Sequence, residues 1–210
     1  MFAKIAAFEL RYQLKNPVFW VSAGLFFLFT LLSVVSDNIH IGSSGNVHIN
    51  SPAAIATTSL IFTIFFMFVS TAFVANVVVR DDETGFGPIV RSTRVAKFDY
   101  LIGRFVGAFA TILIAFLTIP VAIMLGSVMP WVDPEKLGAF HLQPYLYAYL
   151  LLAAPSLFVT AAGFFALATA TRSMMATYLG VVAFLILWTV ASVVLAVSYT
   201  HLTLPTKRIV

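Results

Sequence analysis

Two long uncharged blocks flank a single charged segment in the middle of this chain. The block Ile39–Val79 contains no Asp, Glu, Lys or Arg, and the block Phe105–Val132 contains none either. Between them lies the segment Arg80–Arg104, which carries both signs of charge and which we term the charged island. Because charged side chains favour water over hydrocarbon, the pattern predicts apolar membrane helices on both sides of the island, with the island itself exposed to water.

The apolar stretches are long enough to cross a bilayer as helices. A membrane-spanning helix needs about 20 apolar residues, and no stretch shows the strict alternation of a barrel strand. Lipid offers no hydrogen-bond partners to backbone N–H and C=O groups, so a spanning segment must pair these groups internally, as a helix does. We therefore expect an all-α membrane protein. The predicted spans are approximately Pro17–Ser36, Thr57–Val79, Phe105–Val128, Pro144–Ala170 and Met174–Val197.

The composition agrees with a membrane protein. Hydrophobic residues make up 61% of the chain and charged residues 10%, and the mean hydropathy is +1.01. Soluble domains carry about 25% charged residues. The chain has no cysteine, which excludes disulfides and thiolate metal sites.

The basic residues indicate which side of the membrane each loop faces. Under these spans one side holds Lys4, Arg11, Lys15, Arg80, Arg91, Arg94, Lys97, Arg104 and Arg172. Before the tail, the other side holds only Lys136. The positive-inside rule therefore predicts a cytoplasmic N-terminus and a cytoplasmic island. The pI near 9.5 then reflects membrane orientation, and nucleic acid is not expected as a partner.

Residues 1–16 form a separate N-terminal element. Lys4, Arg11 and Lys15 share one helical stripe, so a helix here could lie in the membrane interface and contact lipid headgroups. The alternative is an ordinary basic flank. Asn16 and Pro17 are expected to mark the turn into the first span. Ser51 and Pro52 are expected to be the N-cap and first-turn residue of the helix that leads into the second span.

The spans themselves offer packing surfaces and no reactive groups. As drawn, they contain no charged side chain, which disfavours an ion-coupled carrier and places any energy source in a partner. Pro120 and Pro155 lie inside spans, where they either kink the helix or are merely tolerated. Small residues suited to helix packing recur every four positions. They are Gly103 and Gly107 on the third span, and Ala162, Ala166 and Ala170 on the fourth.

The charged island divides into an acidic start, a turn and a basic segment. Acidic residues follow Arg80, and the sequence Gly85-Phe86-Gly87-Pro88 predicts a turn. From Ile89 to Arg104 a helical reading places the basic residues on one stripe. A short amphipathic helix held between two spans could dock into a groove on a soluble protein, or it could be a solvated loop that only sets topology.

These residues resemble the membrane subunits of ABC-2 type exporters. The resemblance rests on Asp82-Glu83-Thr84-Gly85, Pro88, Ser92-Thr93-Arg94 and Gly103-Arg104. More narrowly, VVVRDDETGFGPIVRSTRVAKFDYLIGRFVGAFA and ALATATRSMMATY resemble bacterial permeases that are fused, farther along the chain, to an M1-type aminopeptidase-like domain. The resemblance covers about residues 1–196.

The resemblance implies an interfacial helix followed by a six-helix permease bundle, here incomplete at about five spans, in the bacterial inner membrane. It also implies a separate ABC ATPase that docks on the loop of residues 80–104, and pairing of two permease units. The residues expected to couple to the ATPase are Asp82, Glu83, Phe86, Pro88, Arg91 and Arg94. No catalytic residue, metal or cofactor is expected, because neither a phosphate-binding loop nor an H-E-x-x-H motif occurs.

Two further points stay open at this level. Residues 198–210 (SYTHLTLPTKRIV) depart from the preceding pattern and resemble a vector-derived or adapter-derived tail; the alternative is a genuine outer loop. The function also has an alternative, a membrane anchor or scaffold for an enzyme domain that transports nothing. The two functions differ in whether the island binds an ATPase.

Overall fold

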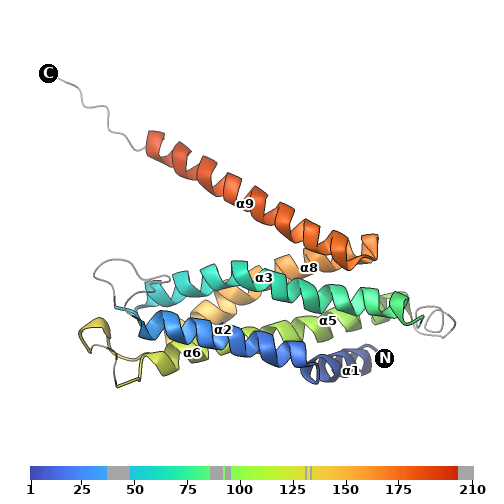
Figure 1. The fold of residues 1–210 in the computed structure, drawn as a ribbon, viewed down its shortest axis with the longest axis horizontal. Coiled ribbons are helices and arrows are strands. Elements are labelled where there is room, and N and C mark those ends of the chain that lie inside the picture. Colours follow the sequence, from blue (N-terminus) through green and yellow to red (C-terminus); the bar gives the residue numbers. More distant parts are fainter. Residues whose placement is uncertain (37–47, 86–91, 93–95, 131, 133, 203–210) are drawn as a thin grey trace.

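The fold is a bundle of long apolar helices with one short helix packed at its end (Figure 1). The structure is a computed structural model, and it describes residues 1–36, 48–85, 92, 96–130, 132 and 134–202. Over these residues it contains helices and connecting turns, with no strand. Five helical stretches in this part of the chain are long and apolar enough to span a membrane. The predicted all-α membrane protein is confirmed.

Short helix α1 and the first long helix follow one another closely. Helix α1 covers Phe2–Leu14 and α2 covers Pro17–Val35. The Asn16 side chain accepts a hydrogen bond from the Val18 amide at 3.0 Å, which caps α2 directly after the turn that the sequence predicted at Asn16 and Pro17. The Trp20 indole N–H donates to the Leu14 carbonyl at 3.0 Å. This bond satisfies one of the carbonyls that the end of α1 leaves without a helical partner.

The two central helices extend beyond the predicted spans. Helix α3 covers Pro52–Glu83, with Ser51 Oγ accepting from the Ala54 amide at 3.2 Å as its cap. Helix α5 covers Lys97–Phe116, and Ala96 before it is extended. Of the helix expected over Ile89–Arg104, residues 97–104 belong to α5, while residues 89–91 and 93–95 lie outside the described residues. Both helices continue past the uncharged predicted spans into charged residues, α3 through Arg80 and α5 from Lys97.

The third and fourth spanning stretches are interrupted. After α5, Leu117 forms a turn, and α6 covers Thr118–Gly126. A short 3₁₀ turn, η1 (Pro134–Lys136), precedes the fourth stretch. That stretch consists of α7 (Gln143–Tyr147), the π-helix η2 (Ala148–Ala153) and α8 (Ala154–Thr171).

Helix α9 (Met174–Leu202) diverges from the rest of the bundle, as Figure 1 shows. It follows Arg172, which adopts the left-handed conformation at φ 49° and ends α8. Its first half contacts α3 and α8, where Thr177 and Val181 are fully buried. Between Met174 and Val197 most other side chains of α9 are exposed.

Aromatic side chains fill the centre of the bundle. Phe62, Phe66 and Phe116 are fully buried, and Phe26 is nearly so. Phe66 lies edge-on to Phe26 at 5.0 Å and to Phe116 at 5.3 Å between ring centroids. Edge-to-face pairs of this kind add to the van der Waals packing that holds helices together in lipid. The core thus joins α2, α3 and α5.

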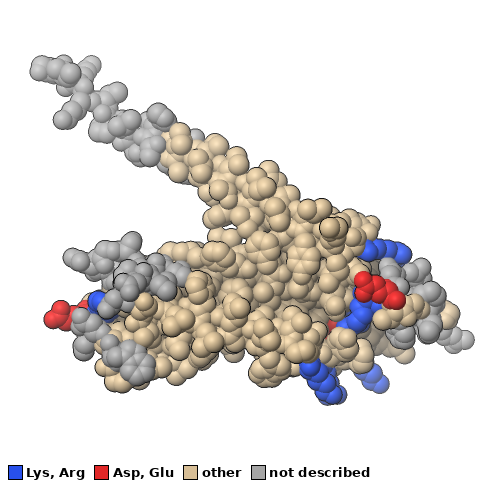
Figure 2. Space-filling model, viewed as in Figure 1, with Lys and Arg blue, Asp and Glu red and all other residues tan. Residues whose placement is uncertain are grey.

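The charges gather at the two ends of the bundle. Figure 2 shows blue and red side chains at both ends and an uncharged surface between them. We call the end formed by α1, the last turn of α3 and the first turns of α5 the charged end. At the opposite end, Asn50 and Gly138 exchange two hydrogen bonds of 2.7 Å, and the Ile49 amide donates to the Lys136 carbonyl at 3.0 Å.

Candidate functional site: a buried charge network

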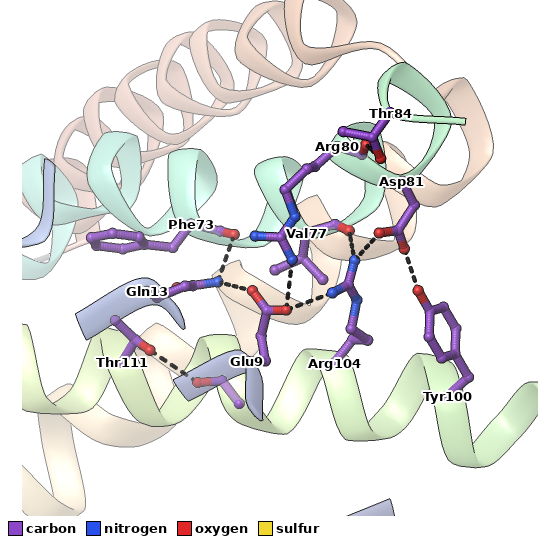
Figure 3. A network of polar contacts seen from close by, with 11 residues as sticks. Glu9, Gln13, Phe73, Val77, Arg80, Asp81, Thr84, Tyr100, Arg104 and Thr111 are labelled. Atoms are coloured by element: carbon purple, nitrogen blue, oxygen red, sulfur yellow. Dashed lines mark hydrogen bonds and ion pairs between the residues drawn. The ribbon is translucent and has the colours of Figure 1, made fainter. Parts of the chain in front are cut away.

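A network of buried polar side chains joins three helices at the charged end (Figure 3). Its centre is Glu9 of α1, whose residue exposure is 0%. The Glu9 carboxylate accepts from Arg80 Nη2 at 2.9 Å and from Arg104 Nη1 at 2.7 Å. We call Glu9, Gln13, Arg80, Asp81, Tyr100 and Arg104 the charge network.

Arg104 is the residue that contacts every helix of the network. It belongs to α5 and is 5% exposed. Besides Glu9 of α1, it binds Asp81 of α3 as an ion pair, and its Nη2 donates to the Val77 carbonyl at 2.7 Å. The planar guanidinium offers several donors in fixed directions, which lysine does not. One side chain therefore fixes α1, α3 and α5 relative to one another.

Gln13 and Tyr100 complete the polar contacts at opposite edges of the network. Gln13 Nε2 donates to Glu9 Oε1 at 2.9 Å and lies 3.4 Å from the Phe73 carbonyl. The Tyr100 hydroxyl donates to Asp81. The guanidinium of Arg80 stacks over the Tyr12 ring, with Cζ 3.9 Å from the ring centroid. Cation–π contact of this kind supplements the ion pair with Glu9.

The charges within the network balance. Glu9 and Asp81 each supply one negative charge, while Arg80 and Arg104 each supply one positive charge. Removing charges from water is costly, so a buried pair contributes little net stability, but removing one partner leaves an uncompensated charge that is strongly unfavourable. The network therefore specifies how α1 docks more than it adds to total stability.

Two glycines allow α1 to approach α5 closely enough for these contacts. A Cβ atom at Gly107 would lie 2.6 Å from the Ala6 carbonyl oxygen and 2.7 Å from Glu9 Cβ. A Cβ atom at Gly103 would lie 3.1 Å from Ile5 Cβ. The G-x-x-x-G pair thus packs against the short helix α1, and not against another span.

The other residues predicted for packing and coupling have separate locations. Ala162 is half-buried, while Ala166 and Ala170 are exposed; the alanines of α8 that are fully buried are Ala161 and Ala168. Asp82 and Glu83 are the last two residues of α3, and Glu83 is exposed. The remaining predicted coupling residues, Phe86, Pro88, Arg91 and Arg94, lie outside the described residues.

Sequence reasoning missed the pairing of Glu9 with Arg80 and Arg104. One local signal for it was present. Glu9 and Gln13 are one turn apart, on the face of α1 opposite the basic stripe of Lys4, Arg11 and Lys15. A polar face opposite a basic face indicates that the helix packs against protein through polar contacts.

A second feature is an apolar groove of about 570 Å³ between α3, α8 and α9. Three hydroxyl groups lie on it, and each donates to a backbone carbonyl three or four residues earlier in the chain: Thr63 at 2.6 Å, Ser156 at 2.8 Å and Thr160 at 3.0 Å. The groove thus presents few free hydrogen-bond donors. Its lining residues are Leu60, Thr63, Ile64, Met67, Pro155, Ser156, Val159, Thr160, Phe184, Leu185 and Trp188.

The charge network links three helices through ion pairs. Both carboxylates are engaged by arginines, so neither is placed to take a proton from a substrate. Among the described residues, no group of three or more His, Asp and Glu side chains could hold a metal ion. Comparison with protein-family models gives no match to this chain, and comparison with curated protein sequences gives none either.

Proposed function

We propose that the chain is the membrane-spanning permease component of an ATP-driven, ABC-2 type exporter. A separate ATPase would bind the loop between α3 and α5 on the cytoplasmic side, and two permease units would pair in the bacterial inner membrane. The apolar groove between α3, α8 and α9 would lie on the substrate path. The proposal rests first on the resemblance of the island to a coupling loop.

One structural observation supports this proposal above the others. The charge network joins the two helices from which the loop departs, because Asp81 at the end of α3 pairs with Arg104 in α5. A push on the loop would therefore move α3 and α5 together and not separate them. Through Glu9, α1 would move with them. An exporter that takes its energy from a partner needs a rigid connection of this kind.

The test is photocrosslinking from the loop in intact cells. A benzophenone amino acid at Phe86 would crosslink to an ATPase if the loop docks on one, and mass spectrometry would identify a protein with a phosphate-binding loop. The matched control places the same probe at Trp188 of α9, a partly exposed aromatic residue that lines the groove. We expect the ATPase adduct from residue 86 alone, with a yield that changes when ATP is depleted.

The opposite result favours a different class of protein. If residue 86 gives no ATPase adduct while the protein is folded and inserted, the loop does not receive energy from ATP. The chain would then be a membrane anchor or scaffold. A second arm keeps the probe at residue 86, replaces residues 87–94 with a Gly/Ser linker and leaves the charge network intact, so a lost adduct cannot be attributed to collapse of the helix ends.

A further inference from the structure

The first of two helix interruptions lies where α5 gives way to α6. Pro120 has no amide N–H, so the carbonyl of Phe116 lacks its usual helical donor four residues later. The helix ends at Phe116, and a new helix begins at Thr118. Thr118 Oγ1 donates to the Ala115 carbonyl at 2.7 Å, so a side chain supplies a hydrogen bond to one of the backbone carbonyls at this interruption.

The second interruption is the π-helix η2 in the fourth spanning stretch. It occupies Ala148–Ala153 and ends where Pro155 enters the first turn of α8. A π-helix holds an extra residue in its turn, and such segments are common where a helix bends or acts in function. Pro155 and Ser156 also line the apolar groove.

The two interruptions contact each other directly. The Tyr149 hydroxyl of η2 donates to the Leu113 carbonyl of α5 at 2.8 Å. The same carbonyl accepts the Leu117 amide at 3.0 Å, which is the hydrogen bond at the point where α5 ends. The rings of Tyr149 and Phe116 lie 6.4 Å apart. The Leu113 carbonyl is thus an acceptor for both interruptions, so a shift of the backbone at either one alters a hydrogen bond of the other.

We propose that the two interruptions act as one paired hinge, with the Tyr149 hydroxyl as the link between them. Bending of the third stretch at Leu117 shifts the Leu113 carbonyl and, through Tyr149, bends the fourth stretch at η2. Because Pro155 and Ser156 lie on the wall of the groove, this motion changes the width of the groove between α3, α8 and α9. The hinge does not depend on the proposed partner ATPase.

The absence of cysteine from the chain allows spin labels to be placed at will. One label pair, Phe98→Cys with Leu125→Cys, spans the first interruption, and a second pair, Leu146→Cys with Ala170→Cys, spans the second. All four positions are exposed. Electron–electron double resonance on the full chain in lipid nanodiscs reports the distance distribution of each pair.

The variant Pro120→Ala restores the missing amide and should straighten the third stretch. We expect the distances of both pairs to shift, although only the first pair spans residue 120. Adding Tyr149→Phe, which removes only the hydroxyl, should abolish the shift of the second pair and keep that of the first. The matched control Tyr147→Phe removes the hydroxyl of a tyrosine that is 54% exposed, and it should leave both shifts intact.

Two results would overturn the paired hinge. One is a second pair that keeps its distance in Pro120→Ala, and the other is a second-pair shift that persists without the Tyr149 hydroxyl. If Pro120→Ala fails to fold, Tyr149→Phe alone decides the matter. Loss of the link should broaden the distributions of both pairs, and unchanged distributions would contradict the proposal.

Discussion

Glu9 and Arg104 form a 2.7 Å ion pair although 95 positions separate them in the sequence. Both residues are buried, and they lie on two helices that pack closely because Gly103 and Gly107 have no side chains. The pair fixes the position at which α1 packs on the bundle. It also supplies the most direct tests of the charge network.

Replacing Glu9 with glutamine should destabilise the protein strongly. The change preserves volume and leaves two arginines with one carboxylate, and loss of one buried charge partner typically costs about 3–5 kcal/mol. We expect a clear fall in the melting temperature, measured by size-exclusion chromatography of heated, detergent-solubilised protein. The matched control is Glu83→Gln at the exposed end of α3, which should melt like the parent protein. Equal melting of the two variants would show that Glu9 is not a buried charge partner.

A double-mutant cycle on Glu9 and Arg104 should show strong coupling. The double variant Glu9→Gln, Arg104→Gln leaves Arg80 and Asp81, whose charges balance. Its loss of stability should therefore be smaller than the sum of the two single losses, by about 0.5–3 kcal/mol. Additive losses in the same melting assay would mean that the two residues act independently.

Substitution of Gly107 by alanine should displace α1. A Cβ atom there would lie 2.6 Å from the Ala6 carbonyl oxygen, which belongs to backbone and cannot easily move aside. Hydrogen exchange of the α1 amides, followed by mass spectrometry, should accelerate. Gly24→Ala is the control, because a Cβ atom at Gly24 meets nothing within 4 Å, and alanine favours the helix by about 1 kcal/mol. Unchanged protection of α1 in Gly107→Ala would contradict the close packing.

At the opposite end, Asn50→Asp should loosen the contact between the segments around residues 50 and 138. Aspartate can still accept from the Gly138 amide but cannot donate to the Gly138 carbonyl. One hydrogen bond is lost, worth about 1 kcal/mol. The amides of residues 48–51 should exchange faster, while those of α1 stay protected. Faster exchange throughout the protein would instead indicate global unfolding.

The predicted orientation can be tested with single cysteines. Leu142→Cys lies near the opposite end, is 49% exposed, and should react with a membrane-impermeant maleimide in intact cells. Lys97→Cys, exposed at the charged end, should react only after the cells are lysed. The reverse pattern would place the N-terminus outside and would remove the loop from any cytoplasmic ATPase.

The order and number of the apolar helices could be predicted from the sequence, because helix length and hydropathy are local properties. The predicted first span, Pro17–Ser36, differs by one residue from α2, since Asn16 and Pro17 mark its start. The third span was placed from Phe105, whereas α5 begins at Lys97. Charged residues were excluded from spans on principle, but pairing with α1 allows Arg104 to lie inside a helix.

The charge network could not be predicted by reading patterns along the chain. The two ion pairs of Glu9 join residues 71 and 95 positions apart, and helical periodicity reports only which face of a helix is polar. Gly103 and Gly107 were predicted to form a packing surface, but the sequence did not indicate that α1 is what contacts them. The split at Leu117 had a local signal in Pro120, although proline in a membrane helix is often accommodated without a break.

The location of Glu9 also sets an order of assembly during synthesis. Glu9 leaves the ribosome before Arg80 and Arg104, which appear only after two spanning helices have been made. A lone carboxylate cannot enter an apolar environment cheaply, so α1 must stay hydrated until the start of α5 arrives. Helix α1 is therefore translated before the spanning helices but docks only after the start of α5 has been made, and its docking marks the point at which the third spanning stretch is in place.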